Sequence, residues 1–513
     1  MSARRLRHMK SESGQAIVIV ALGFVMLLAF TGIVVDVARV FVQRAQLRRA
    51  VDAAGLAATG QFRTGATGPD IVQAAIDLIR AHDIADPSVI VETCGSLPGG
   101  GTTDNPALCP PAGQPKRKLV RISAQAEVSM LFLQLVGINK VPVEASSTAE
   151  AAAVDAVLIL DTSESQAYDA PSGYAYTGDS NLGCKPADVG AENVAACIAA
   201  CTASATHPCY PLQQIKDAAR AFVDRMYQDY DRVAVVGYDR SATTVYHLGI
   251  DLYAAKNAID DLRVYEYAGT ACPYATTVGE RWKCGSSNPG GGLLTASYEF
   301  ANGRQDSLWV ALFLSSGGIN ATDPIPSMGS PENLFGYCPP KNFSDPLSRD
   351  GLPPCRDQRW SVHHQAPTIT MTSPLYDAED YAYDIATYMG SEAKPNGGGG
   401  MGVLFYTIAL GQKAVCTTGV TYAPGPPVIC GDFNPGYMDL DSGLPNTGEL
   451  FLRYVADIGD NGKLNPPGGQ DPNPCYTTGS GYQCGNYYFA PTGNDLLRIF
   501  LEIAGRIFTR ISG

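Results

Sequence analysis

A short polar cluster, Asp161-Thr162-Ser163-Glu164-Ser165, is the segment of this sequence best suited to chemistry. It follows residues 154–160, a nearly continuous apolar run typical of a strand buried on both faces of a parallel sheet. Short carboxylate and hydroxyl side chains on a tight turn after such a strand can converge on one hard cation, and Mg²⁺ requires near-octahedral oxygen coordination. The cluster is therefore suited to bind Mg²⁺, Mn²⁺ or Ca²⁺.

The same cluster has a metal-free interpretation. The hydroxyls of Ser163 and Ser165 can cap the turn that follows them without binding an ion. Glu164 and Asp169 are the nearest further acids, and the sequence does not fix the direction of their side chains. Both interpretations remain open at this point.

The elements that must position this cluster alternate between strands and helices. Further strands are predicted at residues 233–238, 308–315 and 403–410, and amphipathic helices at residues 212–226, 293–300, 376–389, 449–458 and 494–510. This alternation predicts an α/β fold with a doubly wound, mostly parallel, Rossmann-like sheet, whose ligands bind at the carboxyl ends of the strands. Asp161 is expected at such an end.

The N-terminal region predicts a membrane anchor. Residues 16–35 contain no charged residue, and twenty helical residues at about 1.5 Å each span the roughly 30 Å hydrocarbon core. A cleaved signal peptide is the alternative, but its apolar region is usually shorter. We expect residues 1–15 to form a basic cytoplasmic tail and the helix to continue to about residue 60.

Small residues recur in the second half of this helix, at positions 50, 53–55, 57 and 58. They would allow either a partner helix or the chain's own domain to approach closely. Residues 61–150 then predict a small α+β unit, with a helix near residues 70–82 and strands near residues 119–123 and 141–148.

The fourteen cysteines indicate an oxidising compartment. Ten of them form five pairs of near neighbours, which are Cys94 and Cys109, Cys272 and Cys284, Cys338 and Cys355, Cys416 and Cys430, and Cys475 and Cys484. A group of four remains, made of Cys184, Cys197, Cys201 and Cys209. We predict seven disulfides, although structural zinc is an alternative use of cysteine. Because basic residues flank the apolar helix on both sides, the cysteines decide the orientation and place the bulk of the chain outside the cell membrane.

The N-terminal module resembles that of TadG-like proteins of Tad/Flp pilus assembly. The resemblance rests on Gly14-Gln15-Ala16, on Val35-Asp36-Val37-Ala38-Arg39 and on the small-residue segment 47–58, and it extends through about residue 150. It implies a pilus-associated protein whose partners are pilins, other pilus-assembly proteins, or envelope or surface protein ligands.

The large region, residues 153–513, resembles a von Willebrand factor A (vWA) domain. The cluster at 161–165 matches the DxSxS signature of the metal-ion-dependent adhesion site of that family. By their order in the chain, Ser287 takes the place of the family's threonine ligand in a glycine-rich loop, and Ser316 replaces its usual aspartate. The resemblance thus implies a degenerate metal site made of Asp161, Ser163, Ser165, Ser287 and Ser316.

Four long insertions are predicted in this region, at about residues 168–211, 264–285, 320–374 and 416–446, and they hold most of the cysteines. Such loops carry either partner specificity or a protective coat.

Several function classes are disfavoured. A net charge of -13 argues against nucleic acid as a partner, because phosphate binding needs clustered Lys and Arg. The sequence contains no GxSxG, HExxH or Walker motif, so we do not expect an enzyme. The predicted function is a membrane-anchored binding or scaffold component of pilus assembly or surface adhesion, and the alternative is a free-standing surface adhesin unrelated to pili.

Overall fold

The computed structural model describes residues 13–62, 67–84, 86–111, 116–169, 183–184, 189, 193–264, 287–315, 319, 323, 378–392, 399–410, 447–462, 486–490 and 492–510. The chain divides into two compact units, Met1–Ala151 with Thr509–Gly513, and Ala152–Phe508. Each unit is considered by itself.

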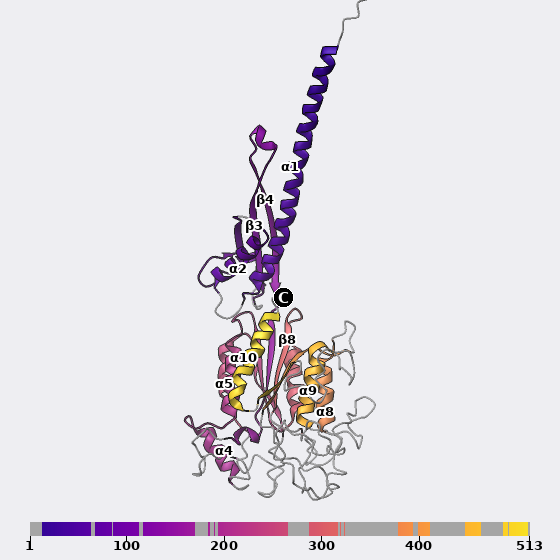
Figure 1. Ribbon diagram of the computed structural model, residues 1–513. Helices are drawn as coiled ribbons and strands as arrows, with labels where there is room; N and C mark the ends of the chain where they lie inside the picture. Colours follow the sequence, from indigo (N-terminus) through magenta and orange to yellow (C-terminus); the bar gives the residue numbers. More distant parts are fainter. Residues whose placement is uncertain are drawn as a thin grey trace, which may run out of the picture. The chain divides into compact units, whose positions relative to one another are not determined.

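The first unit begins with a continuous 47-residue helix, α1 (Ser13–Thr59) (Figure 1). From Ile17 onward this helix is long and apolar enough to cross a membrane, and its most apolar window is only 6% buried. Large apolar side chains from Ile17 to Val35 are exposed, as expected of a surface that faces lipid. The apolar helix thus agrees with the predicted membrane anchor.

The second half of α1 packs on the sheet of its own unit. Leu47, Val51 and the small residues Ala50, Ala54 and Ala58 are fully buried. The helix approaches strand β4 so closely that a Cβ atom at Gly55 would lie 2.9 Å from the Cβ of Ala149. These small residues therefore serve contact with the chain's own domain.

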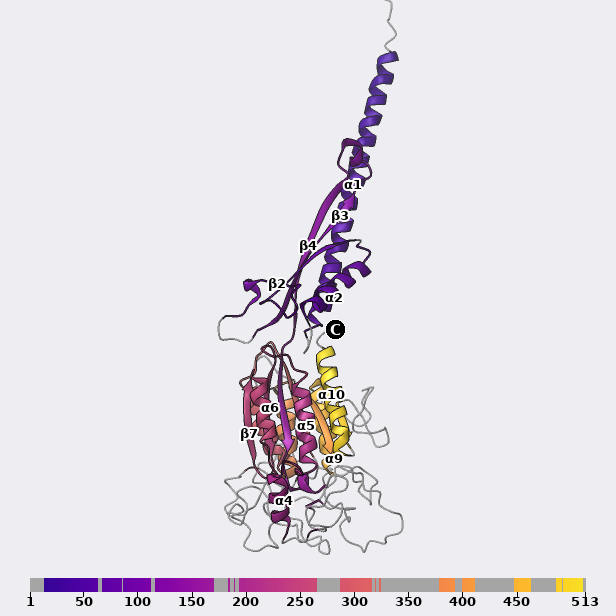
Figure 2. The ribbon, with the colours of Figure 1, turned by 90° about the vertical axis from the view of Figure 1, so that its left-hand side faces the viewer.

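The sheet of the first unit has four strands in the order β2-β1-β3-β4. They are β1 (Ser88–Thr93), β2 (Thr103–Asp104), β3 (Lys118–Ser129) and β4 (Lys140–Ala151). Helix α2 (Gly68–Ala81) packs against α1, and its first turn is closed by a capping box between Thr67 and Asp70. Strands β3 and β4 pair without a break from Lys118↔Ala151 to Ser129↔Lys140, and they form a long hairpin beside α1 (Figure 2).

The tip of this hairpin is held by a single carboxylate of α1. Asp36 is buried, and its two oxygens accept backbone N–H groups from Leu131 (2.8 Å), Phe132 (2.9 Å) and Leu133 (2.7 Å). Four residues earlier on the helix, a Cβ at Gly32 would lie 2.7 Å from the ring of Phe132. The tip thus contacts α1 at residues 32–36.

The second unit is built on a six-stranded sheet of order β10-β9-β8-β5-β6-β7. Its strands are β5 (Val154–Asp161), β6 (Arg232–Tyr238), β7 (Ala242–Gly249), β8 (Leu308–Ser315), β9 (Leu404–Leu410) and β10 (Tyr487–Ala490). All neighbouring strands are parallel except β7, which pairs antiparallel with β6. The predicted doubly wound, mostly parallel α/β sheet is confirmed.

Helices cover both faces of this sheet (Figure 1). One layer contains α5 (Leu212–Val223), α6 (Leu252–Asp260) and α10 (Gly493–Arg510), and the rings of Phe222 and Phe500 meet edge to face between α5 and α10. The other layer contains α7 (Pro289–Phe300), α8 (Ala378–Gly390) and α9 (Thr447–Asn461), whose apolar side chains join one buried cluster with β5, β6, β8 and β9. Every residue of β5 is buried, so this strand is the centre of the core.

A charge cluster holds the amino ends of the central strands together. Asp155 is fully buried and forms ion pairs with Arg232 of β6 and Arg304, which precedes β8. The backbone N–H of Arg304 also donates to Asp155, at 2.8 Å. Burial of Asp155 opposes its ionisation, but the two arginines outweigh that effect and hold the pKa of its carboxyl below the usual value of 3.8.

Removing one member of this cluster should destabilise the second unit. We expect Asp155→Ala to lower its free energy of unfolding by about 3 kcal/mol, because two arginines lose a buried partner. Guanidinium unfolding in detergent, followed by tryptophan fluorescence, would measure this, since all three tryptophans lie between residues 152 and 508. The control is Asp260→Ala, which breaks an ion pair to Arg220 whose side chains are each 42% exposed. It should cost less than about 1 kcal/mol.

The same cluster predicts a pH dependence. Since the pKa of Asp155 is lowered on folding, its stabilisation is present above pH 3.8 and is lost as pH falls through the lower, folded-state pKa. The difference in unfolding free energy between wild type and Asp155→Ala should therefore be constant from about pH 5 upward to neutrality and shrink below about pH 4. A constant difference down to about pH 2 would contradict an ionic role for Asp155.

The contact between Asp36 and the hairpin tip can be tested by hydrogen exchange. We expect Asp36→Ala to accelerate amide exchange at residues 131–133 at least about tenfold, because three N–H groups lose their acceptor. Mass spectrometry of the hairpin peptide in detergent would record it. Asp52→Ala, at an exposed position on the same helix, is the matched control and should leave this exchange unchanged.

Candidate functional site

Asp161 is the last residue of β5 and is fully buried at the carboxyl edge of the sheet. Its Oδ1 accepts the backbone N–H of Ser163 at 2.9 Å, which tightens the turn after the strand. The next residue, Thr162, donates its backbone N–H to the carbonyl of Tyr238 at 2.7 Å and its hydroxyl to the same oxygen at 3.1 Å. The turn is therefore fixed to the end of the neighbouring strand β6.

The two serines of the cluster face one another. Their hydroxyl oxygens lie 3.1 Å apart. Ser163 occupies the N-cap position of the short 3-10 helix Glu164–Ala167, yet its side chain makes no capping hydrogen bond. The capping role considered for Ser163 is thus absent, and its hydroxyl is instead hydrogen-bonded to that of Ser165.

A second acid, Asp239, lies at the same edge and was missed from the sequence. It directly follows β6, one residue beyond the partner of Asp161 in the parallel register, Asp161↔Tyr238. Burial, reinforced by the charge of Asp161, raises the pKa of Asp239 to about 6, although the N–H of Ser241 donates to it at 2.8 Å. Asp239 is therefore near enough to Asp161 for the two charges to interact.

The segment before α7 joins the site through Asp239. The backbone N–H of Asn288 donates to the carbonyl of Asp239 at 2.7 Å, and Ser287, the candidate threonine equivalent, is buried directly before it. The glycines at 290–292 were expected in a loop, but they form the buried first turn of α7. A Cβ at Gly292 would lie 3.0 Å from the ring of Tyr238, so the lack of a side chain here lets the helix pack closely on the sheet.

Another acid missed from the sequence, Asp323, lies next to Asn288. Its Oδ1 accepts the side-chain N–H of Asn288 at 3.0 Å, and its Oδ2 accepts the hydroxyl of Tyr381 at 2.6 Å. Ser316 lies outside the described residues. Within the part of the chain that the structure describes, no three His, Cys, Asp or Glu side chains are grouped as metal ligands, so any site here depends on hydroxyl oxygens as well as carboxylates.

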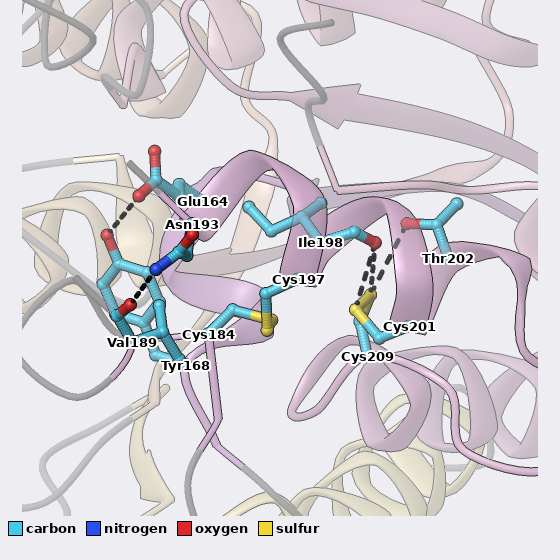
Figure 3. The surroundings of a disulfide bond; sticks show 10 residues. All are labelled: Glu164, Tyr168, Cys184, Val189, Asn193, Cys197, Ile198, Cys201, Thr202 and Cys209. Carbon is cyan, nitrogen blue, oxygen red and sulfur yellow. Dashed lines mark hydrogen bonds between the residues drawn. A yellow bond between two sulfur atoms is a disulfide. The ribbon is translucent and has the colours of Figure 1, made fainter. Parts of the chain in front are cut away.

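The disulfide-linked insertion starts directly after this turn (Figure 3). The hydroxyl of Tyr168 donates to Glu164 at 2.8 Å, which directs that acid toward the insertion. The N–H of Cys184 donates to the carbonyl of Ala167 at 2.8 Å, and Cys184 is bonded to Cys197 of α4 (Val194–Ala203). The insertion is thereby attached to the candidate site.

Three disulfides are present among the described residues: Cys94–Cys109, Cys184–Cys197 and Cys201–Cys209. The first was predicted from the proximity of its cysteines in the chain, and the other two resolve the group of four. The remaining eight cysteines lie outside the described residues.

Loss of the Cys184–Cys197 bridge should loosen the turn beside the site. We expect Cys184→Ala with Cys197→Ala to increase hydrogen exchange at residues 164–169, with about 3 kcal/mol of stabilisation lost for a loop of this length, 13 residues. The matched control is Cys94→Ala with Cys109→Ala, a bridge of similar separation in the first unit. Equal exchange of residues 164–169 in both double variants would contradict the expectation.

Comparison with known proteins gives one family match and several distant structural likenesses. Residues 14–66 match the Tad family, described as putative Flp pilus-assembly TadE/G-like. No curated protein matches the chain.

Among solved structures, the PilB minor pilin from Streptococcus sanguinis aligns at 13% identity and TM-score 0.34, over 83% of this chain and 79% of that one. The vWF domain of the type V pili tip protein Mfa5 from Porphyromonas gingivalis aligns at 14% identity and TM-score 0.33, over 70% and 97%. A von Willebrand factor type A protein from Catenulispora acidiphila aligns at 11% identity and TM-score 0.28, over 83% and 50%. Residues 14–66 are thus similar to the putative Flp pilus-assembly TadE/G-like family, and the chain continues into a unit with a doubly wound α/β sheet.

Proposed function

We propose that this chain is a membrane-anchored, extracytoplasmic binding and scaffold component of Tad/Flp pilus assembly, which engages a protein ligand through a divalent cation at the carboxyl edge of its parallel sheet. The observation that carries the proposal is the convergence of Asp161, the Ser163–Ser165 hydroxyl pair and Asp239 at that edge. The match of residues 14–66 to the pilus-assembly family supplies the biological setting.

The donor set suits a hard cation. Asp161 would supply a charged oxygen, and Ser163 and Ser165 two neutral ones, with Ser287 and Ser316 as further candidates. Asp239 is close enough for its charge to act on Asp161, and it would add negative potential around the ion. Mg²⁺ is the ion that such a small oxygen set favours, and when bound it would accept a carboxylate oxygen of a partner protein in place of a water.

We assign this site a binding role. The match of residues 14–66 to the pilus-assembly family supports that role. The same proposal places both units outside the cytoplasm, since each contains disulfides, and the residues before α1 inside.

Cation binding can be measured directly. We expect calorimetric titration of the purified chain with Mg²⁺, Mn²⁺ or Ca²⁺ to show weak binding, because few charged ligands are present, and Asp161→Ala to weaken it at least about tenfold. Asp217→Ala, at an exposed position on α5, should bind as the wild type does. Binding of all three ions by Asp161→Ala with wild-type affinity would exclude the site, and unfolding of that variant would be seen in its tryptophan emission.

The pilus role requires a separate test in cells. Affinity purification of the chain from native membranes should recover pilins or other pilus-assembly proteins, and Asp161→Ala should recover less of them at equal expression. Recovery of none, together with intact pili in a strain lacking the chain, would favour a free-standing adhesin.

A further inference from the structure

The tip of the β3–β4 hairpin reaches the segment of α1 expected to lie in the membrane. The ring of Phe132 rests on Gly32, inside the uncharged residues 16–35, and Asp36 directly follows that segment. At about 1.5 Å per helical residue, Gly32 lies roughly 5 Å inside the end of the span. The tip is therefore at the depth of one membrane surface.

The side chains of this tip are apolar and exposed. Residues 128–139 contain no charge. The exposed fractions are 83% for Leu135 and 74% for Val136, and Leu131, Phe132 and Ile138 are each nearly half exposed. Exposing apolar surface of this kind to water is unfavourable. The apolar surface extends from the tip onto α1, where Ile33, Val34 and Val37 are also exposed.

We propose that the tip, residues 131–138, inserts its apolar side chains into the same bilayer that α1 crosses, in the leaflet nearest the folded part of the first unit. The occupant of this surface is lipid because the tip is continuous with the transmembrane surface of α1. The hairpin is thus a second, non-spanning membrane contact.

The polar groups of the tip are arranged for such an environment. Non-helical backbone is tolerated near lipid only where its hydrogen bonds are satisfied within the protein. Asp36 accepts three N–H groups of the tip, and those of Leu135, Gly137 and Ile138 donate to carbonyls of the tip itself. The side-chain amide of Gln134 also donates inward, to the carbonyl of Leu131 at 2.8 Å.

Charged residues flank the apolar tip at the level where we expect the hydrocarbon core of the bilayer to end. Glu127 and Lys140 flank the apolar segment on β3 and β4, and they form an ion pair with both side chains exposed. A lysine at this level can keep its ammonium group among the lipid headgroups. Asp36 is buried and accepts three backbone hydrogen bonds, which explains how an acid is accommodated next to the segment expected to span the membrane.

The experiment places a tryptophan at the tip of the full chain in nanodiscs. Leu135→Trp is compared in ordinary and in dibrominated phosphatidylcholine, because bromine quenches only tryptophans that contact acyl chains. The matched control is Ile90→Trp, whose site is 54% exposed on β1. Ile90 pairs with Ser123, six residues from the end of β3, and thus lies about 20 Å farther along the hairpin.

After the emission of the wild-type tryptophans is subtracted, we expect brominated lipid to quench a fraction of the emission in Leu135→Trp at least about three times as large as in Ile90→Trp. Val136→Trp provides a second position if Leu135→Trp does not fold. Equal quenching at the tip and at residue 90 would overturn the proposal. Blue-shifted emission at the tip without bromine quenching would also overturn it, since a protein partner or a second copy would then cover this surface.

Discussion

Parallel hydrogen bonding of β5 between β6 and β8 is the constraint on which the second unit depends. All of β5 is buried, and its register places Asp161 beside Tyr238 and Leu160 beside Leu314. Because parallel strands end at a common edge, this register alone brings the polar turns after β5 and β6 together. The hydroxyl of Tyr238 donates to the carbonyl of Leu314 at 2.9 Å, which ties the end of β6 to that of β8. The geometry of the candidate site thus follows from the hydrogen-bonded register of β5 with β6 and β8.

The buried aspartates at the two ends of β5 have neighbours of opposite charge. At the amino end, Asp155 is neutralised by two arginines, and it contributes to folding. At the carboxyl end, Asp161 lies near another acid, Asp239, whose pKa is raised. Acids placed near each other oppose folding, and groups with perturbed pKa values cluster at functional sites. In the proposed function the amino edge of the sheet serves stability, and the carboxyl edge binds the cation.

Local patterns in the sequence were enough to predict the central features of the fold. The apolar run before Asp161, the uncharged span of residues 16–35 and the spacing of Leu212, Ile215 and Phe222 each concern neighbouring residues, so periodicity and length identify them. The sheet class followed from the alternation of such segments. The sequence predicts a shorter β3 than the strand that runs to Ser129, because Ala124 and Ala126, which continue its buried face, are of a residue type uncommon in strands.

Features that depend on contacts between distant residues could not be predicted in this way. Asp239 and Asp323 reach the site only through strand order and helix packing, and neither belongs to a motif. Asp155 looked like a mere interruption of an apolar run. The resemblance to the vWA family places the glycines before Leu293 in a loop, whereas they form the first turn of α7 and permit it to approach Tyr238. The pairing of Cys184 with Cys197 required knowledge of where α4 lies.

The long β3–β4 hairpin has a mechanical consequence. The chain leaves the first unit at Ala151, the end of β4, and α1 enters that unit from the apolar segment that we expect to span the membrane. Tension between the anchor and the second unit therefore acts along β4, parallel to its pairing with β3 from Lys118↔Ala151 to Ser129↔Lys140. The hydrogen bonds between β3 and β4 lie perpendicular to such a pull, so all of them bear the force at once in shear. They cannot break one after another from one end, as they would if the two strands were pulled apart sideways. The pairing of β3 with β4 thus resists such a pull along its whole length.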